Sequence, residues 1–265
     1  MRYVSIIYTQ KDRIANITLN RPEADNTINQ QLAQELEDIC YKINQDDNIY
    51  VVVITGAGDR AFCGGSELER LIQADNTAEV SSAKLKDLST KCNAAAAIAS
   101  IDRPVIAAIN GAALGQGLEL ALSCDIRLAS HQARFGLPQV ASGLIPMGGG
   151  TQRLPRLIGR GKALELILTA ETMGTEEARE IGLVSQVVPR ENLTSEVETL
   201  AQTIASKAPI ALRYIKEAVN KGMDLTLEQG LRLEADLYFL LHTTADRTEG
   251  IKAFLEKRLP QFKGQ

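Results

Sequence analysis

The fold expected for this chain is decided by VIAAINGAALGQGLELALSCDIRLAS, residues 105–130. The stretch opens with an apolar run at 105–110, passes through a glycine-rich turn and continues into the segment GLELALS. A short apolar run that ends in glycine predicts a strand, and the longer segment after the turn predicts a helix. DIRLAS (125–130) then resembles a second strand. This alternation of strand and helix indicates an α/β fold in which helices cover a sheet.

Another glycine turn with the same layout lies earlier in the chain, after the strand-like run VVVIT (51–55). There GAGDR leads into AFCGGSELERL (61–71), and a third glycine cluster, GLIPMGGGTQRL, spans 143–154. In the first two clusters a strand ends in glycines where a helix starts, which exposes backbone N–H groups at a helix N-terminus. Such a terminus favours an anion or a developing oxyanion. The alternative is that each turn is only a tight connection.

Other catalytic and phosphate-binding patterns do not match this sequence. GQGLEL lacks the third glycine of a dinucleotide fingerprint, and Gly161-Lys162 lacks the other residues of a phosphate-binding loop. His131 and His242 lie among polar neighbours, and there is no Gly-x-Ser-x-Gly elbow. No group of His, Cys, Asp and Glu has metal-ligand spacing. We therefore expect neither a nucleophilic triad nor a metal site.

Glu119 is the acidic residue with the most unusual setting. It lies within GLELALS, which is otherwise apolar. Burying a carboxylate is costly unless the site uses it, so a buried Glu119 is a candidate acid or base. The alternative is that Glu119 faces solvent on an amphipathic helix.

The rest of the chain divides into an α/β part and a helical part. Further strands are expected at 3–9 and 14–19, and helices at 28–46 and 82–99. After about Gly149 only VSQVV (184–188) resembles a strand, and helices are expected at 160–170, 175–182, 191–207, 209–221 and 226–258. We predict a core over residues 1–200 and a helical region over 201–265. The apolar faces of that region must pack on the core or on a neighbouring subunit, which favours an oligomer.

Composition is that of an ordinary soluble globular protein. The 265 residues are 45% hydrophobic and 23% charged, and the net charge of −4 gives no basic excess to attract nucleic acid or an anionic membrane. No apolar run reaches the roughly 18–20 residues that span a bilayer. The four cysteines form no Cys-x-x-Cys pair and are expected to be reduced. We expect a cytoplasmic protein that binds neither nucleic acid nor membrane.

Taken in order, the glycine clusters resemble the crotonase (enoyl-CoA hydratase/isomerase) family. The similarity runs through ITLNRPEADNTIN (17–29), VVVITGAGDRAFCGGSEL (51–68), IAAINGAALGQGLELALSCDIRLAS (106–130), ARFGLPQVASGLIPMGGGTQRLPRLIG (133–159) and DRTEGIKAFLEKRLPQFKG (246–264). The resemblance implies a crotonase-like spiral core of ββα turns, a C-terminal helical trimerisation region, and homotrimers that often pair into hexamers. It also implies an acyl-CoA substrate and no separate cofactor, because coenzyme A arrives as part of the substrate.

The same resemblance implies how the substrate is bound. The backbone N–H groups of Ser66 and Gln116 would form an oxyanion hole for the thioester carbonyl oxygen. The family has glycine where Gln116 stands, so this donor requires Gln116 to adopt a suitable backbone conformation. Phe254 and Lys257 match positions that contact the nucleotide end of coenzyme A from a neighbouring subunit. The other expected substrate contacts are Ala61, Cys63, Gly64, Gly65 and Gly115. Glu67 is expected to cap the helix that follows it.

The catalytic residues that the resemblance implies are Glu119 and Gln139. Typical hydratases of the family use two glutamates, and Gln139 stands where the second is expected. An amide cannot act as a general acid or base, although it can orient water or a carbonyl. Hydration of an α,β-unsaturated acyl-CoA, or the reverse dehydration, is the leading hypothesis. The alternatives are one-carboxylate reactions (double-bond isomerisation, decarboxylation or C–C hydrolysis) and a catalytically silent oligomeric binding protein.

The acyl group is not fixed by the sequence. The family comparison places residues 71–100 beside the acyl pocket, with Leu71, Ile72, Leu85, Leu88 and Ala94 to Ala97 as candidate lining residues. Most of these are expected to fill the core instead. Straight, branched and alicyclic acyl groups all stay open.

Overall fold

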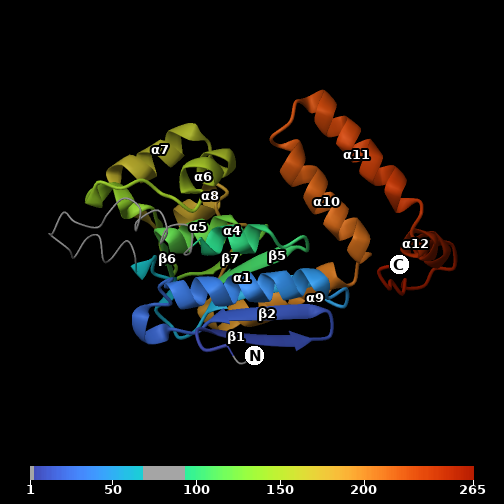
Figure 1. Cartoon of the computed structure of the whole chain (residues 1–265), viewed down its shortest axis with the longest axis horizontal. Helices are drawn as coiled ribbons and strands as arrows, with labels where there is room; N and C mark the ends of the chain where they lie inside the picture. Colours follow the sequence, from blue (N-terminus) through green and yellow to red (C-terminus); the bar gives the residue numbers. More distant parts are fainter. Residues whose placement is uncertain (1–2, 68–92) are drawn as a thin grey trace.

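A six-stranded sheet forms the centre of the molecule (Figure 1). The computed structural model describes residues 3–67 and 93–265. The strand order is β1-β2-β3-β5-β7-β10, in which β1 pairs antiparallel with β2 and the other neighbours are parallel. The strands are β1 (Ile6–Lys11), β2 (Ile14–Leu19), β3 (Val51–Gly56), β5 (Val105–Ile109), β7 (Ile126–Ser130) and β10 (Gln186–Val188). Each lies within or overlaps a run that the sequence predicted as a strand.

A second, smaller sheet carries the glycine turns. Its order is β4-β6-β8-β9, and β4, β6 and β8 are parallel to one another. The strands are β4 (Ala61–Cys63), β6 (Ala112–Leu114), β8 (Phe135–Gly136) and β9 (Thr172–Met173). Because adjacent parallel strands end at the same edge, the segments that follow β4, β6 and β8 leave this sheet side by side.

Helices cover both faces of the six-stranded sheet. Along β3, Val52 and Ile54 join one buried cluster while Val51 and Val53 join another, as expected for side chains that alternate across a strand. α1 (Gln30–Gln45) contributes to the first cluster, together with α4 (Ala94–Ala99). α9 (Leu193–Ala205) covers the second. Shorter helices complete the core: η1 (Pro22–Ala24), α5 (Gln116–Leu122), η2 (Pro138–Ser142), α6 (Gly150–Ile158), α7 (Arg160–Thr169), α8 (Thr175–Glu180) and η3 (Arg190–Asn192).

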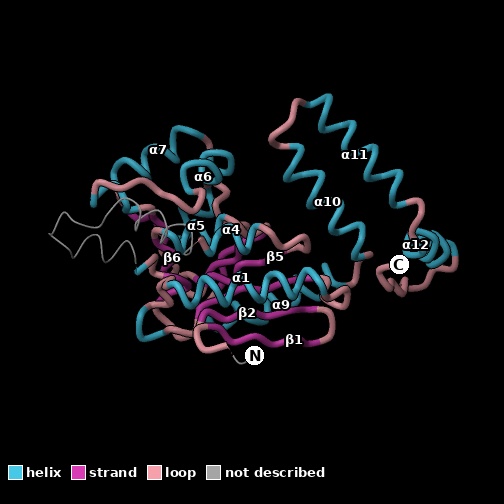
Figure 2. The backbone as a smooth tube through the Cα atoms, in the orientation of Figure 1, coloured by secondary structure: helices cyan, strands magenta, loops and turns pink. Residues whose placement is uncertain are grey.

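Three C-terminal helices extend from the core as an arm, with α10 (Pro209–Gly222) and α11 (Leu227–Leu241) packed as a pair (Figure 2). α9 continues to the buried Ala205, so the division expected after residue 200 falls inside a core helix and the arm starts at α10. The single helix expected over 226–258 is two helices. It ends with α11 and restarts as α12 (Ala245–Leu255), where the Thr244 side chain caps the new N-terminus by accepting from the N–H of Arg247.

Exposed apolar side chains lie along the arm. They include Ile215, Val219, Met223, Leu227, Leu231, Tyr238 and Phe239. The base of the arm is fixed to the core because Lys216 Nζ on α10 lies 2.7 Å from Asp125 Oδ2. A rigid apolar surface of this kind supports the prediction of an oligomer, which a single chain does not test.

Cys40 and Cys124 are buried free thiols. Burial raises the pKa of both Cys40 and Cys124 to about 12, so these thiols stay neutral at physiological pH. Within the described ranges, no helix has the length and apolar character needed to cross a membrane.

Candidate active site

Four predicted site residues meet where β4, β6 and β8 end. Ser66 follows β4, Gln116 and Glu119 lie on the helix after β6, and Gln139 lies on η2 after β8. The register pairs Ala61 with Ala112 and Ala113 with Phe135, which places the three connections next to one another. Ligands of α/β proteins bind outside the carboxyl ends of parallel strands. Topology alone therefore gathers these residues at one site.

The first glycine turn, residues 64–67, is held against residues 25–28 by three backbone hydrogen bonds. The N–H of Gly64 donates to Asp25 O at 2.8 Å, the N–H of Ile28 to Gly65 O at 2.8 Å, and the N–H of Glu67 to Ile28 O at 2.9 Å. Gly65 has a φ of 116°, a conformation that favours glycine. Ser66, the predicted donor, is buried within this frame.

Glu67 forms an ion pair with Arg21. Its Oε1 lies 2.5 Å from Arg21 Nη2, and Arg21 Nη1 also donates to Thr27 O at 2.6 Å. The helix that Glu67 was expected to cap lies outside the described residues. The contact therefore ties the far end of the first turn to the segment that supports it.

The second turn resolves the question about Gln116. Gly115 takes the unusual conformation, with φ 52° and ψ −127°, and Gln116 is the first residue of α5. Gln116 does not have a positive φ. This backbone conformation does not require glycine at position 116, and the Gln116 N–H donor stays a prediction.

The two turns pack directly on each other. A Cβ added to Gly117 would overlap the carbonyl oxygen of Cys63 and lie 2.7 Å from its carbonyl carbon. Contacts this short leave no space for any side chain. Gly117 therefore lets the start of α5 approach the end of β4, which fixes the spacing between the turns.

Glu119 faces the interior rather than solvent. Its side chain is fully buried, and its Oε1 accepts a hydrogen bond from the N–H of Gly150 at 2.7 Å. Gly150 is the first residue of α6, where the partial positive charge of the helix N-terminus favours an ionised carboxylate. Added Cβ atoms on Gly148 and Gly150 would lie 3.1 Å from Glu119 atoms. The third glycine cluster thus serves to enclose this carboxylate.

Gln139 is buried on the neighbouring connection. Its backbone carbonyl accepts from the N–H of Leu144 at 3.0 Å, and the side chain of Leu137, two residues earlier, lies against Gly150 beside Glu119. An amide at this place supplies hydrogen bonds without a second negative charge near Glu119.

Support for α5 comes from a residue that the sequence analysis missed. All seven residues of α5 are buried, so its last carbonyls have no access to water. Arg127 Nη1 donates to Ala121 O of α5 at 3.5 Å and to Cys124 O, just after the helix, at 2.6 Å, and its Nε donates to Leu183 O at 2.8 Å. The available signal was an arginine between the apolar residues Ile126 and Leu128 of a predicted strand.

Phe254 and Lys257 do not join the site within one chain. Phe254 lies on α12, is 83% exposed, and lies on the far side of the molecule from β6 and α5 (Figure 1). The contact of Phe254 and Lys257 with the substrate of a neighbouring subunit stays a prediction. Of the candidate acyl-pocket residues, Leu71, Ile72, Leu85 and Leu88 lie outside the described residues, whereas Ala94 and Ala95 are buried and Ala96 is exposed.

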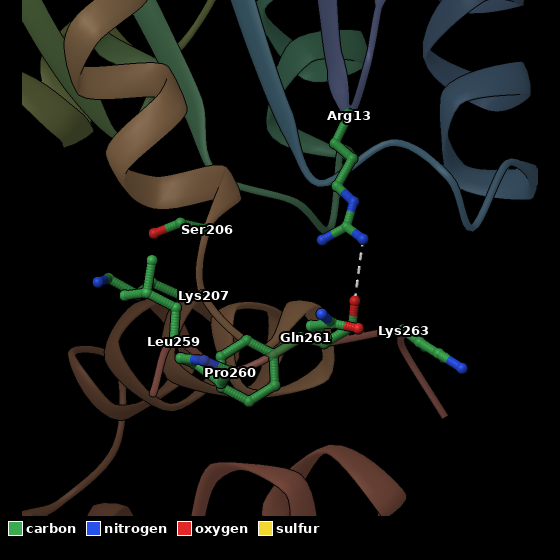
Figure 3. Close-up of a pocket in the computed structure, with 8 residues that line it drawn as sticks. Arg13, Ser206, Lys207, Leu259, Pro260, Gln261 and Lys263 are labelled. Carbon is green, nitrogen blue, oxygen red and sulfur yellow. Dashed lines mark hydrogen bonds between the residues drawn. The ribbon is translucent and has the colours of Figure 1, made fainter. Parts of the chain in front are cut away.

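A cavity of about 450 Å³ lies at the opposite end of β2 and does not include any predicted site residue (Figure 3). It is lined by Arg13, Ser206, Lys207, Leu259, Pro260, Gln261, Phe262 and Lys263. Arg13 Nη2 donates to Phe262 O at 3.0 Å, while the Lys207 and Lys263 side chains point away from each other. The positively charged side chains of this cavity therefore do not converge on one binding position. The residues that the structure describes contain no cluster of His, Cys, Asp and Glu that could hold a metal ion.

The fold and site together define an α/β protein with two glycine turns beside one buried carboxylate. A family model described as enoyl-CoA hydratase/isomerase matches residues 9–265, and the chain belongs to this family. The crotonyl-CoA hydratase of Syntrophomonas wolfei is 40% identical, with 99% of each chain covered. The 2,3-dehydroadipyl-CoA hydratase of Escherichia coli is 38% identical, covering 98% of this chain and 99% of that relative.

The fold assignment is confirmed by solved structures. The crystal structure of an enoyl-CoA hydratase from Bacillus anthracis aligns with a TM-score of 0.93 at 40% identity, covering 99% of this chain and 100% of that one. The similarity spans the core and the C-terminal helices alike. The crotonase-like α/β architecture expected from the sequence is therefore correct.

Proposed function

We propose that this protein is a hydratase-type lyase that adds water to an α,β-unsaturated acyl-CoA, or removes it in the reverse direction. The observation that carries the proposal is the buried Glu119, one turn into the helix that starts at the Gly115–Gln116 turn and packs on the first turn. A carboxylate enclosed in this way, beside amide groups at two turns, matches the needs of enolate chemistry. The names of the relatives support the same reaction.

The oxyanion hole supplies the electrostatic part of the mechanism. The N–H groups of Ser66 and Gln116 donate to the thioester carbonyl oxygen, which becomes negatively charged when water oxygen bonds to C3 and the C2–C3 π electrons form the enolate. One oxyanion donor is typically worth about 10²–10³ in kcat. The turns thus stabilise charge that exists only as the reaction proceeds.

Glu119 supplies the proton transfer. It accepts a proton from the attacking water, and the enolate collapses as a proton is delivered to C2 from Glu119 or through water. Gln139 orients the water or the carbonyl and moves no proton. Protons, oxygen and electrons therefore balance with one carboxylate.

The experiment that tests the proposal is incubation of the purified protein with crotonyl-CoA in ¹⁸O-labelled water, followed by mass spectrometry. We expect 3-hydroxybutyryl-CoA that carries the label at C3. If the protein binds coenzyme A thioesters yet incorporates no label from a series of enoyl-CoA substrates, the alternatives of double-bond isomerisation, decarboxylation or C–C hydrolysis would be favoured over hydration. For the isomerase alternative, 3-enoyl-CoA substrates would be converted to 2-enoyl-CoA without incorporating ¹⁸O. This second function is favoured by Gln139, which replaces the second glutamate of typical hydratases.

Gln139→Glu tests whether the missing carboxylate limits the rate. We expect kcat for crotonyl-CoA hydration to rise about tenfold, less than the about 10²–10⁴ of a full proton-transfer role, because a second buried carboxylate is costly beside Glu119. Steady-state rates at several pH values measure this. Gln139→Met is the matched control and loses activity, since it can neither orient water nor transfer a proton. A strong loss in Gln139→Glu would instead mean that the site requires a neutral group there.

We also propose that the arm assembles the chain into homotrimers, which can pair into hexamers. The exposed apolar side chains of α10 and α11 support this, and assembly would bring Phe254 and Lys257 to the coenzyme A of a neighbouring subunit. Light scattering of the purified protein tests it, and a monomeric mass would rule it out.

A further inference from the structure

Asn26 connects three segments around the first glycine turn. Its Oδ1 accepts from the N–H of Arg21 at 3.0 Å, and its Nδ2 donates to the carbonyls of Ala57 and Ala61, both at 2.9 Å. The side chain is fully buried and uses both of its amide hydrogens. Asn26 also has a φ of 55°, a left-handed conformation that asparagine tolerates better than most residues other than glycine.

Asn110 plays the same part for the second turn. It follows β5 and precedes β6, the strand that leads to Gly115 and Gln116. Its Oδ1 accepts from the N–H of Gly56 at 3.1 Å, and its Nδ2 donates to Gly58 O at 3.1 Å and Ala61 O at 3.4 Å. Its side chain is also buried.

The two asparagines therefore share one acceptor, the carbonyl of Ala61. Ala61 begins β4, whose end carries the first turn, and Ala61 pairs with Ala112 in β6, whose end carries the second. Asn26 approaches Ala61 from the segment that braces residues 64–67, and Asn110 approaches from the strand that feeds α5. One carbonyl thus connects the supports of both proposed oxyanion donors.

We propose that Asn26 and Asn110 are positioning residues that set the distance between the Ser66 and Gln116 amides through the carbonyl of Ala61. The inference rests on the proposed function of these amides as an oxyanion hole. Oxyanion donors act only when they are aimed within a fraction of an ångström of the developing charge. Neither asparagine touches the substrate in this scheme, so both act through the turns.

Asparagine-to-aspartate substitutions remove both donors to the shared carbonyl, together with the bonds from Asn26 to Ala57 O and from Asn110 to Gly58 O. Asn26→Asp and Asn110→Asp keep the side-chain volume and the Oδ1 acceptor but replace the Nδ2 donor with an oxygen that repels Ala61 O. Asn44→Asp is the control for loss of an Nδ2 donor away from the turns, at a half-buried position whose Oδ1 also accepts from Arg103 Nη1 at 3.4 Å. Asn44 also links two separate segments, donating to Ser100 O at 2.8 Å and accepting from the N–H of Asp102 at 3.2 Å, but it does so away from the turns.

The test measures the carbonyl directly with butyryl-CoA labelled with ¹³C at the thioester carbon, which binds but cannot be hydrated. In the unaltered protein, isotope-edited infrared spectra should show the bound carbonyl stretch at lower frequency than in solution. We expect Asn26→Asp and Asn110→Asp to lose at least half of this shift and about 10²-fold in kcat on crotonyl-CoA, the effect of one lost donor, with KM within about threefold. Asn44→Asp should keep both. The double variant should lose little more than the worse single variant, because both bonds end on one carbonyl.

The outcomes separate the positioning role from a purely structural one. If folded Asn26→Asp and Asn110→Asp keep both the unaltered carbonyl shift and the unaltered kcat, the positioning role is overturned, whatever happens to Tm. If Asn26→Asp does not fold, Asn110→Asp alone decides, since its bond to Ala61 O is the longer one. If the unaltered protein itself shows no shift with bound butyryl-CoA, the oxyanion hole fails first, and this inference falls with the proposed function.

Discussion

Glu119→Gln should lower kcat for crotonyl-CoA hydration by about 10³–10⁴-fold. A single proton-transfer role is worth about 10²–10⁴, and here the same carboxylate both takes and returns the proton. The buried Gln139 offers no substitute, because an amide does not titrate. The glutamine can still accept the hydrogen bond from Gly150, so the variant should fold. Loss of the conjugated-thioester absorbance measures the rate, and ¹⁸O incorporation verifies the product.

Glu67→Gln is the matched control for this experiment. Glu67 is adjacent to Ser66 but is paired with Arg21, with its side chain 41% exposed. We expect less than about a threefold change in kcat, since a partly exposed ion pair contributes little. If Glu119→Gln kept more than a tenth of the activity while Glu67→Gln lost most of it, the acid/base role would belong to Glu67.

The strands and turns were predictable because they depend on local sequence. The run at 14–19 coincides with β2, and VIAAIN and VVVIT each end in the glycine turn that follows a strand. The break between α11 and α12 was not predicted, since neither glycine nor proline marks residues 242–244 and the Thr244 cap is visible only in the structure. Caps made by a single hydroxyl carry a weak signal within an apolar pattern.

The site was predictable as a set of turns but not as a geometry. Glu119 could not be assigned to the interior from the sequence, because a seven-residue helix that is buried on every side has no polar face to indicate its orientation. Asn26 and Asn110 were missed because the carbonyls to which they donate lie 31 to 52 residues away, and such contacts leave no periodic trace. Phe254 and Lys257 face outward in one chain, so only an assembly can test them.

Gly117→Ala should strongly destabilise the protein. Alanine is the better helix former, yet its Cβ would overlap the carbonyl of Cys63, a backbone atom in β4 that cannot move without shifting the first turn. Overpacking a core typically costs about 1–3 kcal/mol and occasionally more, and we expect at least the upper value here. Chemical denaturation measures it.

Gly161→Ala is the matched control, because Gly161 also lies in a helix but an added Cβ there meets nothing within 4 Å. It should stabilise the protein by up to about 1 kcal/mol through helix propensity alone. The same substitution thus changes the free energy of unfolding in opposite directions at two helical glycines, and contact with β4 is the difference.

Activity separates packing from chemistry. Well below its Tm, Gly117→Ala should still have a lower kcat, because displacing Cys63 moves the Ser66 amide relative to Gln116. A folded Gly117→Ala protein with full stability and full kcat would mean that the two turns are not in contact, and the oxyanion hole would need another support.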